Sequence, residues 1–94
     1  MAMIGQLNSF DSTEENWTTY MERLDQFLIA NNIQEDMRKR AVFLSTIGSS
    51  TFSLLKSLVA PANPGDLPLD QLKATLRQHF EPRPLKIAEY MEII

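Results

Sequence analysis

The residue of this chain best suited to acid–base chemistry is its only histidine, His79. Histidine changes its charge near neutral pH, so it is a frequent general base in hydrolytic sites. A hydrolytic triad would also need a nucleophile and an acid beside the imidazole. His79 lies between Gln78 and Phe80, and Phe80 is a candidate for the hydrophobic core, so a structural or surface histidine fits better than a catalytic one.

Two acidic pairs, Glu14–Glu15 and Glu35–Asp36, are the candidates for binding a metal ion. Metal sites need several ligands gathered in one place, whereas acidic residues at the start of a helix are stabilised by the helix dipole. Each pair lies where a helix is expected to begin, so we predict no metal site. The chain has no cysteine, and its three glycines are too far apart for a phosphate-binding loop. We therefore expect no cofactor, no small-molecule substrate and no enzymatic activity.

The only basic cluster covers residues 38–40 (Arg-Lys-Arg), and helical geometry would spread it around the helix axis. The chain has nine Lys and Arg residues and twelve Asp and Glu residues, so its net charge is −3. Proteins that neutralise phosphates present a broad basic surface. Nucleic-acid binding is therefore not expected.

Residues 41–61 contain a single charge, Lys56, and are long enough to cross a bilayer, which takes roughly 20 apolar residues. They also contain seven hydroxyl side chains, and Gly48 is followed directly by Ser49. Glycine permits the left-handed residue that ends a helix, and a following serine can cap the next one. We therefore predict two short helices that meet at a corner, each with one apolar stripe, and no membrane span. The expected stripes are Met37, Ala41, Leu44 and Ile47, then Phe52, Leu55, Leu58 and Val59.

The rest of the chain predicts a compact all-α bundle of four to five short helices in one domain. Residues 1–11 are expected to form an extended arm, and residues 12–94 the helical domain. Ser12 with Glu15 resembles a capping box at the start of the first helix, and Asn31–Asn32 ends that helix near Ala30. The second helix is expected to begin at Glu35 and to end at Gly48, and the third to follow and end before Pro61. The fourth is expected from Leu67 or Leu69 to Pro82, and the fifth from Pro84 onward.

Helical spacing also predicts the core of the bundle. The expected core residues are Trp17, Tyr20, Leu24, Phe27, Leu44, Leu55, Leu72, Leu76 and Phe80. The last helix would carry Leu85, Ile87, Ala88, Met91 and Ile94 on its apolar side.

An ordered series of segments resembles the capsid region of gypsy-type LTR retrotransposon Gag polyproteins. The segments, by residue number, are 10–11 (FD), 15–20 (ENWTTY), 23–27 (RLDQF), 30–33 (ANNI), 39–48 (KRAVFLSTIG), 54–61 (LLKSLVAP) and 72–84. The resemblance covers about residues 4 to 89. No single segment is decisive, because each consists of core and capping residues, but the ordered set is more specific than any member.

The resemblance implies a helical N-terminal lobe of a capsid protein that self-associates. In Gag a second helical lobe follows, and often a zinc knuckle; these 94 residues contain neither, and residues 89–94 depart from the family pattern. That departure fits an excised lobe or a host-domesticated remnant. Similar lobes occur in the neuronal protein Arc, where the lobe also binds peptides. A cytoplasmic location is expected, as part of a virus-like particle in a full Gag, with the nucleus as an alternative.

Three modes of association follow as hypotheses. Self-association would use polar residues on the outer sides of the first two helices: Thr18, Glu22, Asp25, Gln26, Arg38 and Lys39. A peptide ligand would pair with the extended arm beside a groove between helices. A homodimer would form through the last helix. The residues expected to take part in the groove or the dimer are Ile4, Leu7, Phe10, Leu85 and Met91.

Overall fold

The computed structural model describes residues 4–82, and these residues form an all-helical globule without a strand. The elements are α1 (Trp17–Ala30), α2 (Asp36–Thr46), α3 (Ser49–Val59), the 3₁₀ turn η1 (Pro64–Asp66) and α4 (Leu69–Phe80). The prediction of an all-α fold is confirmed, and its four helices over these residues are the first four of the sequence prediction. The expected fifth helix lies outside the described residues.

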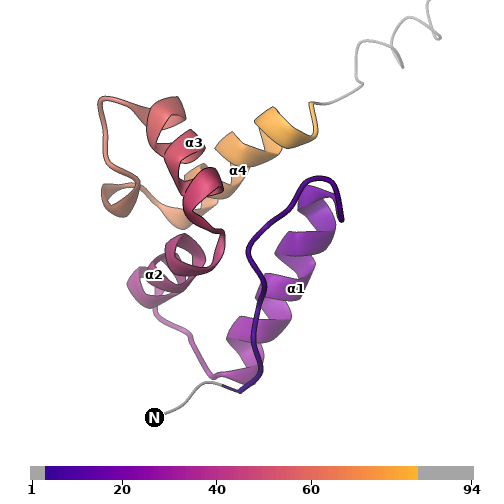
Figure 1. The fold of residues 1–94 in the computed structure, drawn as a ribbon. Coiled ribbons are helices and arrows are strands. Elements are labelled where there is room, and N and C mark those ends of the chain that lie inside the picture. Colours follow the sequence, from indigo (N-terminus) through magenta and orange to yellow (C-terminus); the bar gives the residue numbers. More distant parts are fainter. Residues whose placement is uncertain (1–3, 83–94) are drawn as a thin grey trace, which may run out of the picture.

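An arm of residues 4–11 runs beside α1 in the opposite direction (Figure 1). The side-chain amide of Asn31, at the end of α1, donates to the carbonyl of Ile4 over 3.1 Å and accepts a hydrogen bond from the Ile4 N–H. At its other end the arm is tied to the corner after α2, where the Phe10 N–H donates to the carbonyl of Ile47 over 3.2 Å. The arm therefore belongs to the packed body and is not a separate unit.

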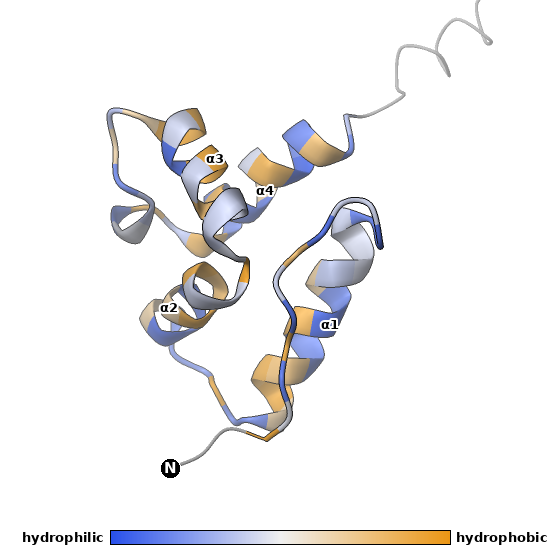
Figure 2. Cartoon of the chain, viewed as in Figure 1, coloured by the Kyte–Doolittle hydropathy of each residue, from blue (hydrophilic) through white to orange (hydrophobic). Residues whose placement is uncertain are grey.

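Helix α4 packs against α1, α2 and α3, so it completes the core (Figure 1). Each helix carries hydrophobic and hydrophilic residues on different sides, as an amphipathic helix requires (Figure 2). Arg40 of α2 donates from Nη1 to the carbonyl of Leu67 over 2.9 Å and so holds the segment that leads into α4.

The start of α1 differs from the sequence prediction. The helix begins at Trp17, and Asn16 is its cap, because the Asn16 side chain accepts from the Thr19 N–H over 2.7 Å. The four residues before Asn16 form a turn, since Asp11 accepts from the N–H and the hydroxyl of Thr13 at 2.9 and 2.6 Å. Such local side-chain bonds compete with helix formation. The prediction of a capping box at Ser12 was therefore wrong.

The corner between α2 and α3 is confirmed. The two helices are bent by 119° at a short break, and Gly48 has φ 94°. A Cβ atom at Gly48 would lie 2.8 Å from Cβ of Ser9 in the arm, so this position requires glycine for both conformation and space. Ser49 is already helical, and neither it nor Gly48 provides a side-chain cap, so the expected serine cap was wrong.

Burial corrects part of the predicted stripes. Phe43 of α2 and Ile47, the residue that follows the helix, have no exposed area, whereas Met37 is 70% exposed. Phe43 packs against Trp17 of α1, with ring centroids 6.1 Å apart, and Met37 lies about 120° around the helix axis from Phe43, so it is left outside. In α3 the buried residues are Thr51 and Leu55, and Leu58 is 43% exposed.

Among the nine expected core residues, six are buried: Trp17, Tyr20, Leu24, Leu55, Leu72 and Leu76. Leu44 and Phe80 are partly buried and pack against the core. Phe27 is half-buried and lies against the arm instead. The core also contains residues that the expected list omitted: Phe10, Leu28, Ile33, Phe43 and Ile47.

Candidate interaction surface

An aromatic junction joins the arm, α1, α2 and α4, and consists of Phe10, Trp17, Tyr20, Phe43 and Phe80. The ring of Phe10 lies 5.0 Å from that of Trp17, 5.2 Å from that of Tyr20 and 4.8 Å from that of Phe80, centroid to centroid. Edge-to-face contacts at such distances add to the stability gained from burial. The junction therefore holds the arm against the helices.

The polar atoms of the junction have partners. Nε1 of Trp17 donates to the carbonyl of Lys73 over 3.2 Å. The Tyr20 hydroxyl lies 2.6 Å from the carbonyl oxygen of Asn8 and 3.0 Å from that of Thr46, so one side chain links the arm to the end of α2. Burial raises the pKa of Tyr20, which keeps this hydroxyl protonated and able to donate at neutral pH.

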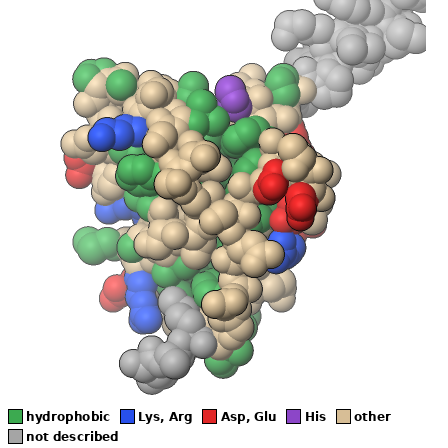
Figure 3. All heavy atoms as spheres, in the orientation of Figure 1, with side chains coloured by type: hydrophobic (Ala, Val, Ile, Leu, Met, Phe, Trp, Pro, Cys, Tyr) green, Lys and Arg blue, Asp and Glu red, His purple; other side chains and the backbone are tan. Residues whose placement is uncertain are grey.

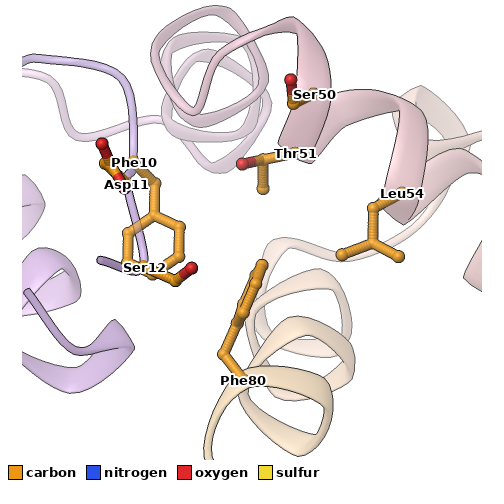
Figure 4. A pocket seen from close by; sticks show the side chains of 7 residues that line it. All are labelled: Phe10, Asp11, Ser12, Ser50, Thr51, Leu54 and Phe80. Carbon is orange, nitrogen blue, oxygen red and sulfur yellow. The ribbon is translucent and has the colours of Figure 1, made fainter. Parts of the chain in front are cut away.

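A hollow of about 340 Å³ opens beside the junction, where Phe10, Phe80 and Leu54 face one another (Figure 4). Its rim carries Asp11 and three hydroxyl side chains, from Ser12, Ser50 and Thr51. The Thr13 hydroxyl and, less strongly, the Thr13 N–H lower the pKa of Asp11, so this carboxylate is committed to the turn before α1.

A second hollow, of about 500 Å³, lies between the arm and α1 and is called here the arm–α1 hollow. Ile4 and Leu7 of the arm face Phe27 of α1 across it. The backbone N–H groups of Gln6 and Leu7 donate no hydrogen bond within residues 4–82. The arm therefore offers an apolar surface beside backbone groups that can still bond.

The third feature is a groove of about 450 Å³ between α1 and α4, called here the α1–α4 groove. Helix α1 supplies Thr18, Met21 and Glu22, and α4 supplies Lys73, Ala74 and Arg77, with the edge of Trp17 beneath them and Asp70 and Gln78 at its ends.

Glu81, which follows α4, binds the start of α1 at Thr18, a residue that also lines this groove. Its carboxylate accepts from the Thr18 hydroxyl over 2.6 Å and from the Thr18 N–H over 3.4 Å. Helix α1 has no acidic residue in its own first turn, so Glu81 supplies the negative charge that its positive end favours. These contacts, the hydroxyl bond first, lower the pKa of Glu81.

A fourth hollow, of about 330 Å³, lies where α1, α2 and the start of α4 meet, and charged side chains line most of it. Three are acidic (Asp25, Asp36, Asp70) and three are basic (Lys39, Arg40, Lys73). The charges therefore balance, and one pair, Lys73 and Asp25, lies 3.6 Å apart.

The six residues expected for self-association do not share one face. Thr18 and Glu22 line the α1–α4 groove, and Gln26 lines the arm–α1 hollow, to which Glu22 also contributes. Asp25 and Lys39 line the charge-balanced hollow. Arg38 is exposed and lines none of these depressions. On the face drawn in Figure 3, charged side chains lie toward the margins, with hydrophobic side chains exposed between them.

The residues expected for a peptide groove or dimer are also divided. Ile4, which is 65% exposed, and half-buried Leu7 line the arm–α1 hollow. Phe10 is 8% exposed and belongs to the aromatic junction, so it cannot present a free side chain to a ligand there. Leu85 and Met91 lie outside the described residues.

The structure also places His79, the acidic residues and the apolar stretch of α2 and α3. His79 is exposed on α4, and its ring lies edge-to-face against Phe80 with centroids 5.0 Å apart. Within residues 4–82 no three His, Cys, Asp or Glu side chains gather as a metal site would require. In the same part of the chain, no single helix is long and apolar enough to span a bilayer; α2 and α3 reach that length and composition only as a bent pair.

The basic side of the α1–α4 groove was missed from the sequence. Lys73 and Arg77 are four residues apart, and Ala74 lies between them on α4. This spacing places them on one side of a helix, which was the signal available. The sequence could not show that α1 would bring Glu22 opposite them.

Comparisons of the chain with protein-family models, with curated proteins and with solved structures find no match.

Proposed function

We propose that this chain is a non-enzymatic assembly module, the capsid N-terminal domain of a retrotransposon Gag or of a host-domesticated Gag-derived protein, and that it acts by self-association. The observation that carries the proposal is the ordered series of segments that resembles the gypsy-type capsid region from about residue 4 to residue 89. The all-helical body formed by residues 4–82 is compatible with such a lobe.

The physical division within the body suits such a role. An assembly subunit needs a firm interior and outer faces that bind weakly, because many weak contacts repeated in a closed symmetry give a stable particle. The aromatic junction supplies a buried interior with its polar atoms bonded. The depressions along α1 supply outer faces with apolar and charged groups.

The first test is the solution mass of the chain, measured by sedimentation from about 20 µM to about 1 mM, the range in which weak contacts show. We expect the average mass to rise with concentration. The mass of a single chain throughout this range would overturn the proposal.

A second test concerns the α2 face. Arg38 is exposed, whereas Lys39 is half-buried in the charge-balanced hollow, so of the two Arg38 is the better placed to reach a neighbour. We expect the double variant Arg38→Glu, Lys39→Glu to associate differently from the parent chain while its circular dichroism stays the same. Unchanged association would remove these two residues from the contact surface.

Peptide binding is the second candidate function, and the arm–α1 hollow favours it. Apolar side chains of Ile4, Leu7 and Phe27 line this hollow next to arm N–H groups without partners in residues 4–82. An extended peptide could pair with the arm and place alternate side chains in the hollow. Titration with apolar peptides, followed by amide chemical shifts, tests this. Shifts confined to the arm and α1 are expected; a silent titration contradicts it.

A further inference from the structure

The floor of the α1–α4 groove is apolar and uncovered. Met21 is half-buried, and Ala74 is exposed although it lies in the middle of α4. No described segment crosses above these two side chains, so the groove is open to a partner. A partner that covered them would remove apolar surface from water, which is favourable.

The two sides of the groove carry opposite charges at the same level. Thr18 lies beside Glu81 and Asp25 lies beside Lys73, so α1 and α4 run in opposite directions. Glu22, halfway between Thr18 and Asp25, is therefore level with the turn of α4 from Lys73 to Arg77. Within residues 4–82 Glu22 forms no ion pair with either. Asp70 adds one acid farther along, at the start of α4.

We infer that a second copy of this chain docks on the α1–α4 groove, related by a two-fold axis that runs along the groove. This inference rests on the self-association proposed above and names its surface. The rotation places α1 of each copy over α4 of the other. Met21 and Ala74 of both copies then meet at the centre, and Glu22 of each copy faces Lys73 and Arg77 of its partner. Isologous contacts of this kind are the commonest in homo-oligomers.

The size of the surface indicates a weak contact. Helices of 14 and 12 residues are about 21 and 18 Å long, and each is about 10 Å wide. The two-helix face therefore buries at most about 390 Å² per copy, or about 780 Å² in total, less than the roughly 1,200 Å² at which stable interfaces begin. Such a contact is populated only at high concentration or when an assembly repeats it.

Charge favours a second copy over a partner that carries only one sign of charge. A surface with an acidic side and a basic side is complementary to itself under this rotation, whereas a partner with one sign of charge would be repelled by one side. The chain's own residues 84–94 carry three charged residues, Lys86, Glu89 and Glu92, and are otherwise mostly apolar. This segment carries both signs of charge, as the groove does, so it is the competing occupant that the last test below separates from a second copy.

The test uses the whole chain and two charge reversals, Glu22→Arg and Arg77→Glu, both at exposed positions. In the parent chain we expect the amide signals of Met21 and Ala74 to shift as the concentration rises from about 20 µM to about 1 mM. Each variant alone should lose these shifts, because like charges then face each other across the axis. An equimolar mixture should regain them, because the arginine introduced in one variant then faces the glutamate introduced in the other. No regain in the mixture overturns the inference.

A matched pair of alanine variants tests the floor. Ala74→Glu places a charge at the centre of the contact, and Ala41→Glu makes the same change at an exposed position of α2 outside the groove. Both should keep the parent's circular dichroism. We expect Ala74→Glu to abolish the concentration-dependent shifts and Ala41→Glu to leave them unchanged. Equal behaviour of the two variants overturns the inference.

The remaining outcomes separate this inference from the proposed function. Concentration-dependent shifts that map outside the groove would overturn the groove as the contact and leave self-association standing. A chain without any concentration dependence would overturn both. The double variant Leu85→Glu, Met91→Glu is measured at low concentration. If it shifts the amide signals of the groove residues, the chain's own residues 84–94 occupy the groove, and this outcome also overturns the inference.

Discussion

The two sides of α1 differ in a way that separates stability from contact. On one side Trp17 and Tyr20 are 1% and 0% exposed and meet Phe10 and the other helices in the aromatic junction. Next to this buried side, Thr18, Met21 and Glu22 line an open groove, and the edge of Trp17 reaches its floor. Both sets lie within the first two turns of the same helix. Changes in the junction should therefore cost much of the stability, whereas changes in the groove should cost little and alter mainly what the protein touches.

The largest expected effect is that of Trp17→Ala in the junction. Removing this side chain leaves a cavity and removes the hydrogen bond from Nε1 to the carbonyl of Lys73. We expect the free energy of unfolding to fall by about 3–5 kcal/mol, much of the stability of a small domain. Urea denaturation measures it. The control is Met21→Ala in the groove, which should cost about 1 kcal/mol because that side chain is only half-buried. Equal losses would contradict the difference between the two sides.

Gly48→Ala should have the next largest effect. The added Cβ would lie 2.8 Å from Cβ of Ser9, at a backbone φ of 94° that side chains disfavour. We expect a loss of about 1–3 kcal/mol in the free energy of unfolding. Gly65→Ala is the control, since a Cβ atom there would have no neighbour within 4 Å and the φ of Gly65 is not positive. A neutral Gly48→Ala would show that the arm does not hold this corner.

Tyr20→Phe tests the link between the arm and α2 without changing the volume of the junction much. It leaves the carbonyls of Asn8 and Thr46 without the Tyr20 hydroxyl. We expect a loss of about 1–2 kcal/mol in the free energy of unfolding. The rate of amide hydrogen exchange should increase more at Phe10 than at residues in the middle of α4. Uniform exchange changes would contradict a specific role in holding the arm.

Glu81→Gln should have the smallest effect, and it is visible only in the dependence of stability on pH. The pKa of Glu81 in the folded chain is below its ordinary value of 4.5, so its contribution is present above about pH 4.5 and is lost as pH falls through the lowered pKa. We expect the parent chain to lose more stability than the variant over that acid range. Thermal unfolding at a series of pH values measures this. If the stability of the parent chain and of the variant falls equally with pH, the Thr18–Glu81 contact is not the cause of the acid dependence.

Local signals predicted several helix ends well. Asn32, with φ 56°, follows α1, Gly48 forms the corner, and α4 ends two residues before Pro82. These residues act through their own backbone preferences, which do not depend on distant partners. The start of α1 was missed because Ser12 and Asn16 both satisfy the pattern of a cap. The turn at Asp11 decided between them.

The faces of the helices were harder to predict. Periodicity alone made Met37 a core residue, but it is 70% exposed, since the side of α2 that packs against Trp17 is the one that carries Phe43. Phe10 was expected to contact a ligand or a second chain, but it is buried in the junction. In both cases the deciding contact joins residues far apart in the chain, so no local pattern could reveal it.

The sequence by itself determined the helical class, the corner at Gly48 and most of the core, because spacing and backbone preference act over a few neighbouring residues. Only the tertiary structure decided that Phe10 of the arm lies in the core, that Glu81 binds the first turn of α1, and that Glu22 lies across a groove from Lys73 and Arg77. Those outcomes depend on how separate helices pack, and packing is set by the fit of surfaces that lie 50 or more residues apart in the chain.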